Sequence, residues 1–268
     1  MISFFDIHAH YIDSRYEEMG VDVDFLLREC FSTDVCKIMN SGTNPENSKK
    51  AIEMAKRYPG MCAAVGIHPS DSFFIDDCDY ALSQIEELVV TERDTVAAVG
   101  EIGLDYHNPD ITDKVKQKFL FDAQLTLAEK HGLPVVIHCR DAIGDCIEIV
   151  DCHPNSKGAF HCFAGSAETA EHLIKRGWFI SVCGNVTYKR SEKLHEVIRR
   201  VGAEHLLTET DAPYMAPAPL RGTLNNSSNI RYSAEYMASL LGMTTDAFAR
   251  QTRKNAERLF RVPKFYEK

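Results

Sequence analysis

The sequence alternates short apolar runs with longer stretches in which apolar residues recur at helical spacing. This alternation is typical of consecutive strand and helix units around a parallel sheet. The apolar runs cover residues 4–8, 36–40, 61–66, 96–102, 134–138, 157–161, 178–183 and 205–209. Eight such units predict a (β/α)8 barrel, the TIM barrel, and a chain of 268 residues suits that fold, which needs roughly 250. We therefore expect a single barrel domain over residues 1–268.

The stretches between the apolar runs predict the crossover helices. The clearest spans residues 113–131, and Gly132 with Pro134 predicts its end. Further helices are expected over residues 45–58, 80–91, 141–151, 166–175 and 190–201, with two extra C-terminal helices over 233–241 and 245–260. Residues 212–231 are rich in Pro, Gly, Asn and Ser, and we expect them to form a long functional loop over the barrel mouth.

Charge and cysteine content exclude some classes of protein. A formal net charge of -9 argues against a broad basic face that coats duplex nucleic acid, although bound cations can supply a local positive field. Nine scattered cysteines without a CxxC spacing predict reduced, buried thiols, as in a cytosolic or nuclear protein. The first residues show no secretory signal, and no stretch predicts a membrane span. We expect a cytoplasmic monomer.

His8 and His10 are two residues apart at the end of the first predicted strand. Their side chains therefore project to the same face, which suits one metal ion. Alone, such a pair is equally consistent with two hydrogen-bonded polar residues. Its position among other chemistry-bearing residues decides between these readings.

Five more candidates fall at the carboxyl ends of other predicted strands, namely His68, Glu101, His138, His161 and Asp211. In a (β/α)8 barrel the carboxyl ends of the strands converge on one mouth, where active sites of this fold lie. Core histidines have no reason to recur at strand ends. The sequence therefore predicts one metal cluster.

Imidazole and carboxylate ligands suit zinc, manganese, nickel or iron, whereas magnesium prefers oxygen. Glu101 is the natural bridge, because one carboxylate can donate an oxygen to each of two ions. Asp211 is the best candidate for a general base or metal ligand that activates water. We therefore expect Glu101 and Asp211 to be catalytic in a site with two divalent ions, whose identity among Zn, Mn, Mg and Ni stays open.

These residues occur in motifs that resemble a known family, the TatD family of metal-dependent deoxyribonucleases within the amidohydrolase superfamily. The ordered motifs span nearly the whole chain: Phe5-Asp6-Ile7-His8-Ala9-His10, Gly66-Ile67-His68-Pro69, Gly100-Glu101-Ile102-Gly103-Leu104-Asp105-Tyr106, Pro134-Val135-Val136-Ile137-His138-Cys139-Arg140, His161-Cys162-Phe163, and Glu209-Thr210-Asp211-Ala212-Pro213-Tyr214. The closing Asn255-Ala256-Glu257-Arg258-Leu259-Phe260 resembles the family's final helix.

The resemblance implies a ligand set and an activity. One metal would be held by His8, His10, Glu101 and Asp211, and the second by Glu101, His138 and His161. The activity implied is hydrolysis of DNA, often as a 3′ to 5′ exonuclease on single strands, with magnesium or manganese. Residue chemistry instead predicts tighter binding of transition metals than of magnesium.

Other residues near these motifs are candidates for substrate contacts. Arg140 and Arg221 could each grip a phosphate, and an ordinary salt bridge is the alternative. His68 and Asp105 could hydrogen-bond a ligand imidazole or a metal-bound water, and structural support is the alternative. The aromatic residues Tyr106 and Tyr214 are also candidates. Each ring could stack on a nucleic-acid base, and packing against neighbouring side chains is the alternative.

One segment departs from the family pattern. After Arg-Gly many members carry Asn-Glu-Pro, whereas this chain reads Leu224-Asn225-Asn226-Ser227-Ser228-Asn229. The departure leaves the predicted ligands intact, and the loss of the acidic residue and the proline predicts a different loop conformation and different contacts around the site.

Two further readings stay open at the level of sequence. The same metals could serve an amidohydrolase-type enzyme that attacks an amide, ester or lactone carbon. Many such enzymes place a carbamylated lysine on the fourth strand, where this chain has Glu101, so a nuclease is favoured. A non-catalytic metal-binding or scaffold protein is the third reading, and turnover on metal addition separates it from both.

Overall fold

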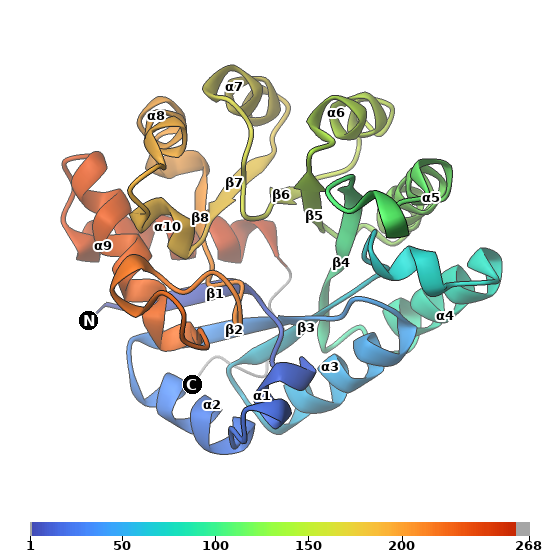
Figure 1. The fold of residues 1–268 in the computed structure, drawn as a ribbon, viewed down its shortest axis with the longest axis horizontal. Helices are drawn as coiled ribbons and strands as arrows, with labels where there is room; N and C mark the ends of the chain where they lie inside the picture. Colours follow the sequence, from blue (N-terminus) through green and yellow to red (C-terminus); the bar gives the residue numbers. More distant parts are fainter. Residues whose placement is uncertain (1, 261–268) are drawn as a thin grey trace. The chain divides into compact units, whose positions relative to one another are not determined.

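The protein is described by a computed structural model that covers residues 2–260. Strands and helices alternate along it (Figure 1) and form two compact units. Among the described residues, the first unit contains 2–40 and 161–258 and the second contains 41–160 with 259 and 260. The prediction of a single domain over 1–268 stays a prediction, and residues 1 and 261–268 lie outside the described part.

The first unit contains four strands and six α-helices. Its strands are β1 (Phe4–Ala9), β2 (Val35–Ser41), β7 (Phe179–Val182) and β8 (Leu206–Thr208). Strand β1 pairs in parallel with β2, β7 pairs in parallel with β8, and β1 also contacts β8. Its helices are α1 (Ser14–Glu18), α2 (Val23–Ser32), α7 (Ala167–Lys175), α8 (Glu192–Val201), α9 (Ile230–Leu240) and α10 (Thr245–Leu259).

The second unit contains the other four strands. These are β3 (Met61–Val65), β4 (Val96–Asp105), β5 (Val135–Arg140) and β6 (Gly158–Phe160), and each pairs in parallel with the next. Helices α3 (Pro45–Arg57), α4 (Cys78–Thr91), α5 (Lys114–His131) and α6 (Ile143–Asp151) connect or follow them. Strand β4 is buried at all but its last position, as expected for a parallel strand covered on both faces.

Local sequence signals explain where these helices begin and end. The Asp113 carboxylate accepts a hydrogen bond from the Lys116 amide and caps the start of α5. Gly132 ends the same helix with φ of 61°, a left-handed conformation that glycine adopts at low cost. The eight predicted strands and the eight predicted helices are confirmed, with boundaries that differ by a few residues.

Three expectations need correction. Helices α1 and α2 were not predicted, because each is short and lies in what reads as a connection. Residues 212–231 are not wholly irregular: they include the 3-10 helices Ala218–Leu220 and Ser227–Asn229, and α9 begins at Ile230. All nine cysteines are free, as predicted, but they are not uniformly buried, since Cys152 is exposed.

Within residues 2–260, no helix combines the length and apolar character that crossing a membrane requires.

Gly103 allows β4 and β5 to approach closely. It has φ of 137°, and a Cβ placed on it would lie 2.0 Å from the backbone oxygen of His138, its partner across the sheet. We expect Gly103→Ala to reduce the stability of the protein by about 2–3 kcal/mol, because strands rather than a flexible side chain must move. Thermal unfolding should show a lower Tm by roughly 5–10 °C.

Gly144 supplies the matched control for this prediction. It lies in α6, and a Cβ there would meet no atom within 4 Å. Gly144→Ala should leave the Tm unchanged or raise it slightly. An equal loss of stability in both variants would show that the approach of β4 to β5 is not the cause.

Candidate metal centre

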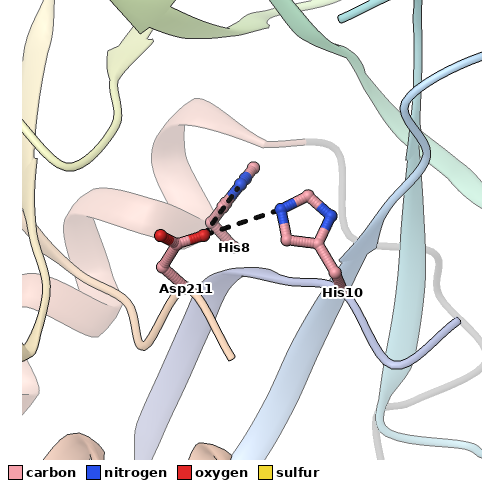
Figure 2. Close-up of side chains that lie close together, drawn as sticks. All are labelled: His8, His10 and Asp211. Carbon is pink, nitrogen blue, oxygen red and sulfur yellow. Dashed lines mark ion pairs between the residues drawn. The ribbon is translucent and has the colours of Figure 1, made fainter. Parts of the chain in front are cut away.

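The first group of candidate ligands joins the end of β1 to the end of β8 within the first unit. His8 and His10 project to the same side of β1, and Asp211 follows β8 (Figure 2). One carboxylate oxygen of Asp211, Oδ1, lies 3.8 Å from Nε2 of His8 and 3.6 Å from Nε2 of His10. Two ligands bound at about 2.1 Å to one tetrahedral ion lie roughly 3.4 Å apart. The spacing of the group therefore fits one divalent ion.

The backbone at Asp211 explains how its side chain reaches the histidines. Asp211 has φ of 56°, in the left-handed region that aspartate tolerates better than most residues. Its amide donates a hydrogen bond to the carbonyl of His8, which ties the turn after β8 to β1. Burial acts to raise the pKa of Asp211, but the hydrogen bond from His10 and the nearby histidine charges outweigh it and lower the pKa. Asp211 is therefore ionised at neutral pH.

His161 lies beside the same group. Its ring centroid is 4.1 Å from that of His8, and its Nδ1 is 3.8 Å from Oε2 of the buried Glu209. The other oxygen of Glu209 accepts a hydrogen bond of 2.6 Å from the amide of Cys162. Burial raises the pKa of Glu209 to about 8, the charge of His161 opposes this rise, and the charge of Asp211 adds to it. Glu209 is thus placed to orient His161.

The second group of candidate ligands lies within the second unit. His68 follows β3 and His138 lies near the end of β5, whereas Glu101 lies in the middle of β4, because that strand continues to Asp105 and not only to residue 102 as predicted. Oε1 of Glu101 is 2.8 Å from Nδ1 of His138 and 3.5 Å from Nε2 of His68. The Asp105 carboxylate lies 3.1 Å from Nε2 of His138. His68 was predicted to support the ligands, whereas its imidazole lies among the candidate ligand atoms of Glu101 and His138.

Asp105 connects this group to α5. Its backbone amide and carbonyl bond to the side-chain amide of Gln117, which is buried in that helix. Burial acts to raise the pKa of Asp105, but the hydrogen bond from His138 and the charges of His138 and His68 lower it overall. The carboxylate is held ionised beside His138, as a residue that orients an imidazole should be.

A buried network under the first group was not predicted. Asp6 is completely buried and accepts hydrogen bonds from the His8 amide, the Thr210 amide and hydroxyl, and the Ser227 hydroxyl. Burial raises the pKa of Asp6 to about 6, and these bonds limit the rise. The sequence signal was present, since Asp6 is an acidic residue inside an apolar strand and two residues before His8.

The segment that departs from the family pattern completes this network. Ser227 donates its amide to the Tyr11 hydroxyl, which donates to the Ser227 hydroxyl. The side chain of Asn225 donates to the carbonyl of Thr210. Asn225 and Ser227 therefore support the turn after β8, which contains Thr210 and Asp211.

The predicted substrate-contact residues have different surroundings. Arg140 is exposed at the end of β5. The Arg221 guanidinium lies 4.6 Å from the ring centroid of Tyr188. Both predicted stacking residues carry a cation over the ring: Lys114 over Tyr106 at 4.2 Å and Arg15 over Tyr214 at 4.5 Å. Their hydroxyls bond to Asp145 and Asp13 respectively, and stacking of either ring on a base stays a prediction.

Comparison with known proteins identifies the family. The family model described as "TatD related DNase" matches residues 5–261. An uncharacterized metal-dependent hydrolase of Bacillus subtilis, YabD, is 38% identical over 260 residues, which is 96% of this chain and 99% of that protein. This chain belongs to the TatD family. It is a metal-dependent hydrolase of that family.

Solved structures of TatD proteins share the fold. The crystal structure of YjjV, a TatD homologue of Escherichia coli K12, matches with a TM-score of 0.87 and 30% identity, covering 97% of this chain and 98% of that one. A TatD-family hydrolase of Entamoeba histolytica matches with a TM-score of 0.86 and 25% identity, covering 98% and 99%. The fold class is the predicted (β/α)8 barrel with extra C-terminal helices.

Proposed function

We propose that this TatD protein hydrolyses phosphodiester bonds of single-stranded DNA, removing nucleotides from the 3′ end with the help of two divalent metal ions. The observation that carries the proposal is the presence of two ligand groups, each with two imidazoles and one carboxylate. Their composition and spacing fit divalent metals, and the matching family model carries the description of a DNase.

In this proposal His8, His10 and Asp211, with His161 beside them, hold one ion. Glu101, His138 and His68 hold the other, and the prediction that Glu101 bridges both ions belongs to the proposal. When bound, such ions stabilise negative charge on a phosphoryl group and make water more acidic. Four or more imidazoles favour zinc, manganese or nickel over magnesium as the native ion.

The remaining steps belong to the side chains of the chain itself. Asp211 is ionised and accepts the proton of the attacking water at its carboxylate. Asp105 and Glu209 hold His138 and His161 in orientation. Arg140 and Arg221 supply the positive charge that a DNA phosphate needs on an otherwise acidic chain.

The test uses metal-stripped protein and single-stranded DNA labelled at either end, with magnesium, manganese, zinc and nickel restored one at a time. We expect release of a labelled mononucleotide from the 3′ label and a ladder from the 5′ label. Glu101→Ala should lower the rate by at least about 10³-fold, whereas Glu53→Ala on the exposed surface of α3 should not change it.

Two other outcomes would contradict the proposal. Turnover of esters, amides or lactones without any release from DNA or RNA would establish an amidohydrolase that attacks carbon. Metal binding without turnover of any of these substrates would indicate a protein that no longer catalyses hydrolysis.

A further inference from the structure

Two cysteines of the first unit lie in direct contact. Cys162 follows β6, Cys183 follows β7, and their Sγ atoms are 3.0 Å apart. Cys183 is completely buried, whereas Cys162 is partly accessible. The side-chain amide of Asn185 contacts both sulfurs, since it accepts from Cys183 at 3.4 Å and donates to Cys162 at 3.8 Å.

The backbone at Cys162 produces this contact. Its φ of 40° lies in the left-handed region, which residues with a side chain rarely adopt outside special sites. Its amide bonds to the buried carboxyl of Glu209, and the amide of Phe163 bonds to the carbonyl of Ser181. Cys162 is therefore fixed against the end of β7, where Cys183 lies.

The geometry favours a covalent pair over a third metal site, although Glu209 could complete a ligand set with the two sulfurs. Two thiolates bound at about 2.3 Å to one tetrahedral zinc lie roughly 3.8 Å apart. The observed 3.0 Å is shorter, and a shift of about 1 Å would reach the disulfide bond length near 2.05 Å. Both oxygens of Glu209 also face groups other than the sulfurs.

We propose that Cys162 and Cys183 are a site of reversible oxidation, at which a peroxide converts the two thiols into a disulfide next to the candidate ligand His161. The partly accessible Cys162 reacts first: its sulfur takes one oxygen from hydrogen peroxide, forming a sulfenic acid and releasing water. The Cys183 sulfur then attacks that sulfur, the S–S bond forms, and hydroxide with the thiol proton leaves as a second water. Each disulfide therefore consumes one peroxide.

The disulfide should disturb metal binding in the first group. Cys162 follows His161 directly, and its amide holds the Glu209 carboxyl that faces the His161 ring. Any part of the displacement of Cys162 that moves the adjacent His161 ring by more than about 0.2 Å exceeds the tolerance on metal–ligand distances. We expect oxidation to lower metal affinity and hydrolysis by about tenfold or more, and dithiothreitol to restore both. The expectation for hydrolysis rests on the proposed function.

Oxidation of this pair must be distinguished from oxidation of the other cysteines. In the second unit Cys146 hydrogen-bonds to Cys139, and Cys152 is exposed. The experiment therefore uses the full chain with Cys146→Ser and Cys152→Ser as background substitutions. Folding of each variant is checked by thermal unfolding before oxidation.

The test treats this protein with a few equivalents of hydrogen peroxide and digests it without reduction. Mass spectrometry should find Cys162 and Cys183 peptides joined, with two hydrogens lost, and dithiothreitol should separate them. Cys183→Ser should abolish the link and leave Cys162 as a sulfenic acid that dimedone captures. This readout does not depend on nuclease activity, so failure of the proposed function and failure of this inference are distinguishable.

Several results would overturn the inference. The folded protein could keep both thiols reduced while exposed Cys152 in the unsubstituted chain is oxidised. One zinc ion could protect both thiols in the background protein but not in Cys183→Ser, which would make the pair a metal site. A disulfide that forms without changing the metal content or the turnover would refute the proposed effect of oxidation on the first group of candidate ligands.

Discussion

Asp211→Asn is expected to lower hydrolysis by about 10³-fold while the protein stays folded. Asparagine keeps the shape of the side chain but removes its charge and its ability to accept a proton. The Oδ1 atom of Asp211 lies within 3.8 Å of Nε2 of both His8 and His10, so the substitution also weakens the ion held there. Steady-state kcat/KM with labelled DNA, together with metal content, measures both effects.

Asp94→Asn is the control, because Asp94 is exposed in the turn before β4. It should retain the activity and the metal content of the unsubstituted protein. If Asp211→Asn keeps more than a tenth of the activity with metal bound, Asp211 is neither the base nor a necessary ligand.

Asp6→Ala is expected to have the largest effect on stability, a loss of about 3–5 kcal/mol. The carboxylate is completely buried and accepts from Thr210 N at 2.9 Å, Thr210 Oγ1 at 2.5 Å and Ser227 Oγ at 2.6 Å. Alanine leaves these donors buried without their acceptor. Thermal unfolding of the metal-free protein should show a Tm lower by roughly 10 °C.

Asp6→Asn tests the explanation, because it keeps one oxygen acceptor and the volume of the side chain. It should lose less stability than Asp6→Ala, and Asp94→Ala should lose less than about 0.5 kcal/mol. A loss below about 1 kcal/mol in Asp6→Ala would show that neighbouring groups or water replace the carboxylate.

The contacts made by the residues around the candidate ligands could not be predicted from the sequence. Asp6 and Glu209 stand inside the recognised motifs, but their partners Thr210 and His161 lie far along the chain. Cys162 and Cys183 are separated by 21 positions and no spacing rule joins them. The role of Ser227 could not be predicted either, because its hydroxyl bonds to Asp6, which lies 221 positions earlier in the sequence.

The sequence by itself determined the alternation of strands and helices, the eight strands and the placement of His8, His138 and Asp211 near strand ends. These properties are local, because side-chain periodicity and helix caps act over a few neighbouring residues. Tertiary structure alone decided which groups touch: the Asp6 network, the position of His68 among ligand atoms, and the thiol contact. Such contacts depend on how distant segments pack, and a sequence pattern of short period carries no information about them.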